Sequence, residues 1–194
     1  ISEELGAHVL QLPYKGEDIS MFFFLPPFAM ARALDQSKSP ADRDGIRNLI
    51  ERMTNTERGI QELQEILNDG ISPRPVEVSI PRFTVEKELP VTRLLGEMGA
   101  GDLVMSSGAN LRGFVEDPDT LHLNDAVHRA KIELNEEGTT AAAATALFSF
   151  RSSRPAEPAV FNANHPFVYL LYDRESQSII FSGIYRTPTG PADA

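Results

Sequence analysis

Residues 138–150 limit the fold of this chain more than any other segment, because they contain no charged residue and no proline. Four consecutive alanines, Ala141–Ala144, lie within them. In an extended conformation the segment would span roughly 40 Å, and neither face of such a strand would carry a charge. A strand of this kind can enter the interior of a large sheet. The same alanines after Glu136 and Glu137 also suit the first turn of a helix, so local sequence alone leaves both structures open.

The composition predicts one globular unit with a sizeable core. The chain has 194 residues, 41% of them hydrophobic, and contains no apolar run long enough to span a bilayer. The formal charge of −10 and the lack of a basic cluster argue against nucleic acid or a membrane as a partner. The lack of cysteine excludes disulfides and cysteine metal sites but does not identify a compartment. No signal peptide is predicted within the chain, which begins at Ile1 without a basic and apolar leader.

Hydrophobic periodicity predicts a β-rich chain with short helices, an α+β architecture. Two apolar pairs with short polar connections predict hairpins, at 8–13 with 19–25 and at 166–172 with 178–185. Helices are predicted at 46–53 and 59–67 after a long polar connection at 26–45. A strand is predicted from Val76 through Phe83 and Val85, leading into a helix over 89–98 with Pro90 in its first turn. Alternation predicts a further strand within 121–134.

Motifs of catalysis are missing from the sequence. It contains no Gly-x-Ser-x-Gly elbow, no His-Glu-x-x-His pair and no glycine-rich phosphate loop. The histidines are His8, His122, His128 and His165, and they lack the spacing of metal ligands. A triad of Asp125, His128 and Ser152 could be proposed, but a chain with this many such residues offers many equivalent trios. The sequence therefore predicts a protein that is not an enzyme and that needs no metal and no cofactor.

Several segments, taken together and in this order, resemble the C-terminal half of the serpins, the serine protease inhibitors. These segments are 5–7, 22–26, 76–83, 94–99, 125–130, 135–145, 161–169 and 181–183. The resemblance implies the C-terminal half of the serpin fold, with mixed sheets, short helices and an exposed reactive-centre loop. Residues 1–187 would belong to a single domain, with the loop at about 136–160 and a tail at 188–194. The N-terminal half would then be a possible partner within the same protein.

The resemblance also assigns a hinge that inserts beside the strand at 121–135 after cleavage. The hinge residues are Glu136, Gly138, Thr139, Thr140, Ala141, Ala142, Ala143, Ala144 and Thr145. A charge forced into a sheet would cost several kcal/mol of desolvation, so small uncharged residues suit an inhibitory hinge. Many inhibitory members carry Glu where this chain has Thr140, at a position that faces solvent after insertion. His128 matches the shutter histidine that helps to hold the central sheet closed; alternatively it is a half-buried, hydrogen-bonded histidine of a strand.

Two reactive bonds are compatible with the loop. Counting fourteen residues beyond Gly138, as the family spacing implies, places cleavage between Ser152 and Ser153 and predicts an elastase-like target. Cleavage between Arg151 and Ser152 would instead suit a trypsin-like protease, whose pocket carboxylate requires a cation. Phe150, Arg151 and Arg154 would contribute to specificity.

The implied mechanism is a conformational trap, in which a serine protease cleaves the loop and the severed loop inserts as a new strand. The resemblance also implies an extracellular, secreted protein. The alternative hypothesis is a truncated, non-inhibitory fragment that is cleaved as a substrate or acts as an interaction module through exposed sheet edges.

Overall fold

The computed structural model describes residues 1–27, 45–105, 108–110, 113, 126–135 and 158–186. The chain divides into two compact units. The first comprises Ile1–Arg82 and Asn135–Ala194, and the second comprises Phe83–Leu134. Most of the predicted connection at 26–45 lies outside the described residues.

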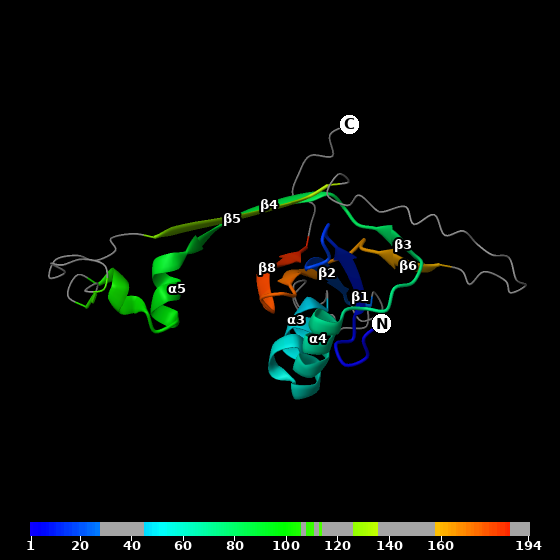
Figure 1. Cartoon of the computed structure of the whole chain (residues 1–194), viewed down its shortest axis with the longest axis horizontal. Helices are drawn as coiled ribbons and strands as arrows, with labels where there is room; N and C mark the ends of the chain where they lie inside the picture. The colour runs from blue at the N-terminus through cyan, green and yellow to red at the C-terminus, as the bar shows by residue number, and fades with distance from the viewer. Residues whose placement is uncertain (28–44, 106–107, 111–112, 114–125, 136–157, 187–194) are drawn as a thin grey trace, which may run out of the picture. The chain divides into compact units, whose positions relative to one another are not determined.

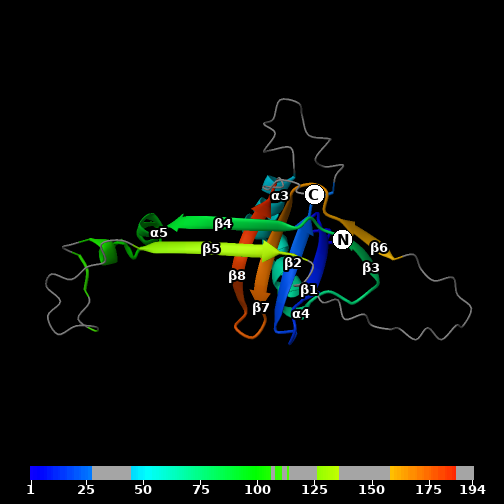
Figure 2. The same ribbon diagram turned by 90° about the horizontal axis from the view of Figure 1, so that it is seen from above.

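The first unit contains a four-stranded antiparallel sheet of β1 (His8–Pro13), β2 (Ile19–Leu25), β7 (Phe167–Asp173) and β8 (Ser178–Tyr185). Its strand order is β1-β2-β7-β8, and Figure 2 shows the four strands side by side. Both hairpins predicted from the sequence are therefore confirmed. In the first hairpin, the Tyr14 amide donates to the Ile19 carbonyl at 2.8 Å, and Gly16 provides a φ of 104° within the turn.

Two helices, α3 (Ile46–Asn55) and α4 (Glu57–Asp69), pack on one face of this sheet. Both were predicted, and each extends somewhat beyond its predicted bounds. Figure 1 shows the two helices on the same side of the strands. Their apolar positions, spaced for one helical face, contact a shared core. The buried members of this core are Leu5, Ala7, Phe22, Phe24, Ile46, Leu49, Met53, Leu67, Val168, Leu170 and Tyr172.

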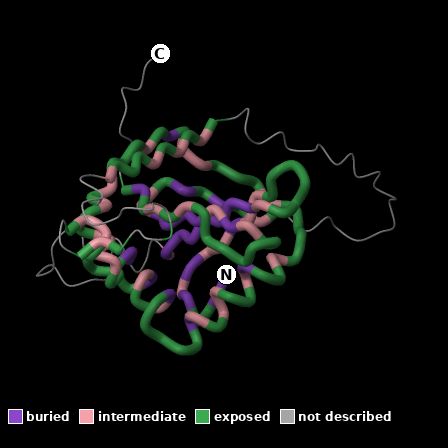
Figure 3. Tube along the Cα trace, turned by 60° about the vertical axis from the view of Figure 1, so that its left-hand side comes forward, coloured by how far each residue is buried: buried purple, intermediate pink, exposed green. Residues whose placement is uncertain are grey.

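The central strands β2 and β7 are buried on both faces. Six consecutive residues of β2, from Ser20 to Leu25, are buried, and β7 is buried in the same continuous way from Phe167 to Leu170. Figure 3 shows these buried stretches as neighbouring strands. On the face away from the helices, the ring of Phe167 lies 5.7 Å from that of Phe23 and 4.9 Å from that of Tyr185. The lack of alternation in these runs thus reflects burial from both sides.

A parallel pair, β3 (Val76–Ser79) and β6 (Ala159–Asn162), completes the first unit. The sequence predicted that the strand starting at Val76 continues through Phe83 and Val85, and this prediction is wrong. The chain leaves β3 after Ser79 and begins a new strand, β4, at Phe83 with a different partner. Pro81 lies in the break, and proline has no N–H to continue a ladder of hydrogen bonds.

The second unit contains an antiparallel ribbon of β4 (Phe83–Pro90) and β5 (Val127–Leu134), with α5 (Val91–Glu97) and the 3₁₀ helix η1 (Gly101–Val104). The helix predicted over 89–98 begins two residues later, at Val91, and ends at Glu97. Pro90 is therefore the N-cap residue and not part of the first turn. Leu89 and Pro90 remain in the strand because they pair with β5. The predicted strand within 121–134 is confirmed over 127–134, and 121–125 lies outside the described residues.

Candidate functional site on strand β5

The segment predicted to be the reactive loop follows β5 in the chain and precedes β6. Its hinge, Glu136 and Gly138–Thr145, lies outside the described residues. So do both predicted reactive bonds and the specificity residues Phe150, Arg151 and Arg154. The described part of the candidate site is therefore β5 and the ribbon that it forms with β4.

One face of the β4–β5 ribbon is mainly apolar. In the strand register, Phe83 lies opposite Leu134, and Val85 lies opposite Ile132. Phe83 is buried, and the other three are of intermediate burial. Along each strand these residues alternate with exposed ones, as expected where only one face of a strand is covered. This face of the ribbon is suited to pack against other apolar surface.

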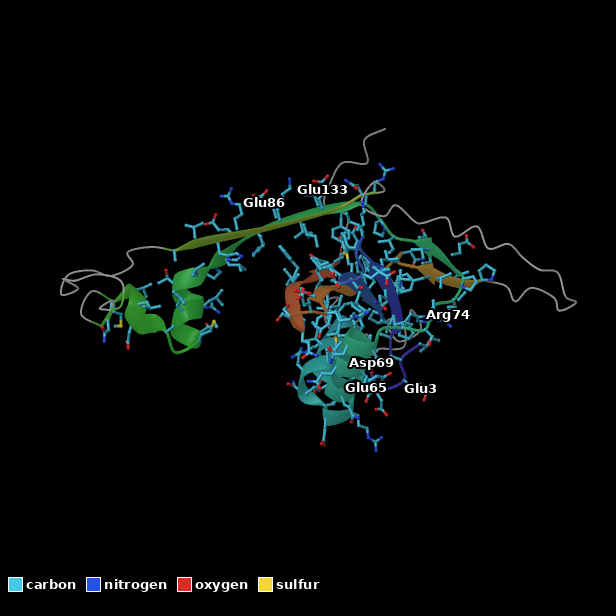
Figure 4. The ribbon with its side chains drawn as sticks, viewed as in Figure 1. Glu3, Glu65, Asp69, Arg74, Glu86 and Glu133 are labelled. Carbon is cyan, nitrogen blue, oxygen red and sulfur yellow. The ribbon has the colours of Figure 1, made fainter. Side chains whose placement is uncertain are left out.

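The opposite face carries alternating charges. Glu86 lies opposite Lys131, and Glu88 lies opposite Arg129, so unlike charges meet in both pairs. Glu133, opposite Thr84, completes the same face. Figure 4 labels Glu86 and Glu133, and both lie on the same side of the ribbon. We refer to this face, formed by Glu86, Glu88, Arg129, Lys131 and Glu133, as the charged face.

Ion pairs connect the residues of the charged face. The Arg129 guanidinium lies 3.5 Å from Glu86 Oε1 and 3.2 Å from Glu88 Oε2. Lys131 Nζ lies 3.9 Å from Glu133 Oε2. These side chains are at least half exposed, so each pair contributes only about 0–1 kcal/mol to stability. Their main consequence is to distinguish the two faces of the ribbon, because desolvating the charges would be costly.

β5 has one unpaired edge within the part of the chain that the structure describes, since its only strand partner there is β4. An edge strand presents unpaired N–H and C=O groups that can accept another strand. A two-stranded ribbon is also marginally stable by itself, and further strands on an apolar face stabilise it. The geometry of β5 therefore favours strand addition.

His128, the predicted shutter histidine, lies on β5 opposite Leu89. Its side chain is exposed, and no hydrogen-bond partner for its ring lies among the described residues. The alternative reading of a half-buried, hydrogen-bonded histidine thus differs from the structure. The shutter role itself stays a prediction.

The charged face was missed by the reasoning from sequence, although a signal was present. Charges recur at every second residue in 129–133, which is the period of a strand with one exposed face, whereas in 86–88 Lys87 interrupts this period. No group of three or more His, Cys, Asp or Glu side chains among the described residues could hold a metal ion. None of the described helices is both long and apolar enough to cross a membrane.

Comparison with known proteins gave one matching family. The family model described as "Serpin (serine protease inhibitor)" matches residues 1–188. Serine protease inhibitor 88Ea of Drosophila melanogaster is 37% identical over 203 residues, a match that covers 97% of this chain and 43% of the relative. The leukocyte elastase inhibitor of Homo sapiens is 34% identical, with coverage of 96% and 45%.

Solved structures agree at the level of the fold. A tumour suppressing serpin superposes with a TM-score of 0.66 at 21% sequence identity. The superposition covers 96% of this chain and 43% of that structure. The chain thus spans less than half the length of the relatives that it matches.

Proposed function

This chain belongs to the serpin family, and from that premise we propose that it is the part of a serine protease inhibitor that carries the reactive loop. The α+β, partial serpin fold predicted from the sequence is confirmed. The relatives are protease inhibitors by name, which supports a serine protease as the partner. One observation carries the proposal: β5 has an edge with no strand partner among the described residues, and residues 138–150, which contain no charge and no proline, follow it after Asn135–Glu137.

The proposed mechanism is suicide-substrate trapping. A serine protease attacks the loop, and the severed loop inserts as a strand beside β5 before the acyl-enzyme is hydrolysed. Insertion adds backbone hydrogen bonds to an unpaired edge and buries apolar surface, so it releases free energy that can hold the protease. Serpin loop insertion is a known example of such strand addition.

The faces of β5 support this insertion in detail. If the chain turns at Glu136–Glu137 and runs back antiparallel to β5, residues opposite one another share a face. Thr139, Ala141, Ala143 and Thr145 would then share the face of Leu134 and Ile132. Thr140, Ala142 and Ala144 would share the charged face, with Thr140 opposite Glu133. In this register no charge enters the apolar face. A glutamate in place of Thr140 would lie opposite Glu133, and like charges in that position are destabilising.

Two target classes follow from the two reactive bonds. Cleavage between Ser152 and Ser153 would suit an elastase-like protease with a small pocket, and the Arg151–Ser152 bond would suit a trypsin-like protease. The first bond fits the family spacing and is the one we favour. Secretion from the cell, which the family resemblance implies, is part of the proposal.

A second candidate function rests on the length of the chain. It spans about 43% of its relatives, and within the described residues the β4–β5 ribbon has two strands. A ribbon without a further strand on the far side of the insertion site offers the loop only one edge. The chain alone would then be cleaved as a substrate without trapping the protease.

The two candidates are separated by incubation with a trypsin-like and an elastase-like protease. The chain is used both alone and fused to the portion of Serine protease inhibitor 88Ea that it does not match. A covalent complex that survives denaturing electrophoresis supports the inhibitor, and mass spectrometry of the released peptide identifies Arg151 or Ser152 as the residue before the cleaved bond. Cleavage of the fused protein without any complex would reject the inhibitory mechanism.

A further inference from the structure

The β4–β5 ribbon has two free edges within the part of the chain that the structure describes, one on each strand. Figure 2 shows the two strands side by side. An edge strand presents backbone N–H and C=O groups to any strand that approaches it, including a strand from a second copy of the chain. In the proposed mechanism only the β5 edge accepts a strand, so the β4 edge should differ from it.

Lys87, in the middle of β4, lies on the face of the ribbon that is otherwise mainly apolar. Because side chains alternate along a strand, Lys87 shares the face of Phe83 and Val85 and not the charged face. Its partner across the ribbon is Ala130. Lys87 is exposed, whereas Val85 and Leu89, its neighbours along this face, are of intermediate burial. A positive charge therefore interrupts the apolar face at the β4 edge.

The Lys87 ammonium group differs from the cations of the charged face. Arg129 and Lys131 lie within 3.9 Å of carboxylate oxygens of the ribbon. Lys87 forms no ion pair with another residue of the described part of the chain. An apolar strand added beside β4 would remove water from this ammonium group without supplying a counter-charge. Desolvation of an unpaired charge opposes such an addition.

The β5 edge has a different pattern on the same face. Ala130, Ile132 and Leu134 follow one another there without a charge, and His128 lies at the end of this row. Proline adds to the difference between the two edges, because Pro90 ends β4 and has no N–H to donate to an added strand. The apolar face is thus continuous along most of the β5 edge and is interrupted at the centre of the β4 edge.

We propose that Lys87 determines which edge of the ribbon accepts a strand: it disfavours addition at β4 and thereby directs an apolar strand to β5. Inward-pointing charges on edge strands prevent pairing between sheets in this way. An apolar residue at position 87 would join Phe83, Val85 and Leu89 into one uninterrupted row, which is typical of strands that self-associate. The role of β5 in this inference rests on the proposed function, but the effect on β4 can be measured without a protease.

The test compares the same substitution at two lysines of the ribbon. Lys87→Val removes a positive charge from the apolar face at the β4 edge, whereas Lys131→Val removes the same charge from the charged face of β5. Both are made in the chain fused to the portion of Serine protease inhibitor 88Ea that it does not match. We expect Lys87→Val to raise the oligomeric fraction at least tenfold, measured by size-exclusion chromatography with light scattering. Lys131→Val should change that fraction by less than twofold.

Two further variants at the same position separate charge from side-chain shape. Lys87→Arg keeps the charge and should remain as monomeric as the wild-type protein. Lys87→Thr removes the charge without adding an apolar side chain, and it should oligomerise in the same direction as Lys87→Val. Because Lys87 is exposed, these substitutions should leave the fold intact, which circular dichroism would verify.

Hydrogen exchange identifies the strand through which the oligomer forms. In Lys87→Val, the β4 amides that point away from β5 should become protected as oligomers form. The proposal is overturned if both neutral variants at position 87 stay monomeric, if the valine variants at 87 and 131 behave alike, or if the oligomer leaves β4 unprotected. Absence of protease trapping by the wild-type fusion, with the expected oligomers of Lys87→Val, would contradict only the proposed function. Normal trapping with a monomeric Lys87→Val would reject only the role of Lys87.

Discussion

At two positions in this chain, Gly183 and Gly59, close packing leaves no room for a side chain. A Cβ at Gly183 of β8 would collide with the ring and hydroxyl of Tyr169, the residue opposite it on β7. A Cβ at Gly59 of α4 would collide with the carbonyl oxygen of Arg52, at the tight turn between the two helices. Gly96 of α5, by contrast, has nothing within 4 Å of its Cβ position. These positions give matched sites at which the cost of one methyl group can be measured.

Gly183→Ala should destabilise the chain by about 1–3 kcal/mol, because the buried ring of Tyr169 must move from a well-packed site. Urea unfolding followed by circular dichroism would measure the change. Gly96→Ala is the control and should be neutral or stabilising by up to about 1 kcal/mol, since alanine favours a helix over glycine. Equal effects of the two substitutions would contradict the close contact at Gly183.

The two faces of the proposed inserted strand lead to a second prediction for single residues. Ala143→Asp should abolish the covalent protease complex and convert the fused inhibitor into a substrate, because the carboxylate would face apolar surface at a cost of several kcal/mol. Ala144→Asp should retain most of the complex, since in the same register it lies opposite Arg129. Gel quantification of complex against cleaved product measures both. The proposed register would be wrong if the two variants behaved alike or in the reverse order.

His8 predicts how stability depends on pH. Burial lowers the pKa of His8 below its usual value, and the nearby charges of the N-terminus, His165 and Arg74 lower it further. The unfolded chain therefore binds this proton at a higher pH than the folded chain does, and stability rises with pH over that range. The contribution of His8 to stability is fully present above the ordinary histidine pKa of about 6.5. It is lost as the pH falls toward the lower pKa that His8 has in the folded chain. The free energy of unfolding should thus decrease on mild acidification.

His8→Gln, which cannot titrate, tests this expectation. Unfolding free energies measured between pH 8 and pH 5 should decrease less for the variant than for the wild-type chain. The difference between the two curves isolates His8 from the other histidines. Parallel curves would show that burial of His8 does not contribute to the pH dependence.

Among the elements, the β4–β5 ribbon has one mainly apolar face and one charged face. Among the described residues, each of its two strands has a strand partner on one edge only. Its apolar residues alternate with the charged face, and Arg129 lies within 3.5 Å of carboxylate oxygens from two β4 residues, Glu86 and Glu88. Such a ribbon can have its apolar face covered while its charged face stays in water. Because apolar and charged residues alternate along β5, a strand added next to it needs a register that places its own apolar residues on the apolar face.

Reversing the charge at Arg129 should expose this cross-strand pairing. Arg129→Glu places three carboxylates side by side and should destabilise the ribbon by about 0.5–1 kcal/mol, and Glu88→Lys in the same chain should recover most of that loss. The effect should shrink at high salt, because exposed charges are screened. Thermal unfolding at low and high ionic strength measures it. A double variant no more stable than the single one would contradict direct pairing of these two residues.

In the whole molecule, the two compact units differ in how much core each contains. Nearly all buried apolar residues lie in the first unit, whereas Phe83 is the one buried apolar residue among the described residues of the second. Local stability follows buried contacts, so the units should not open with the same free energy. The second unit contains β5, and limited stability there would suit a region that accepts a new strand in the proposed mechanism.

Hydrogen exchange of the chain alone should show this difference. Amides of β2 and β7 should exchange by global unfolding, and the paired amides of β4 and β5 should exchange at least tenfold faster. Fusion to the unmatched portion of a relative should slow exchange in β4 and β5. Uniform protection of both units would contradict the division in stability. This measurement requires no protease and is independent of the trapping experiment.

Local sequence was sufficient for the elements whose partners are near in the chain. Both hairpins and the two helices at 46–55 and 57–69 follow from periodicity and from turn residues. Segments such as 161–169 and 181–183 were also enough to identify the family, because their amino-acid sequences are specific to it. The hinge and the reactive bond could be predicted only through this resemblance, and they lie outside the described residues.

Tertiary structure decided the pairing of strands that are distant in sequence. The apolar run from Val76 to Val85 reads as one strand, yet β3 pairs with β6 and β4 pairs with β5. The same long-range pairing kept Leu89 and Pro90 in a strand and delayed the helix to Val91. Periodicity records which side of a residue is buried, but it does not record which segment covers it. The choice of strand partners therefore appears only when the chain is folded.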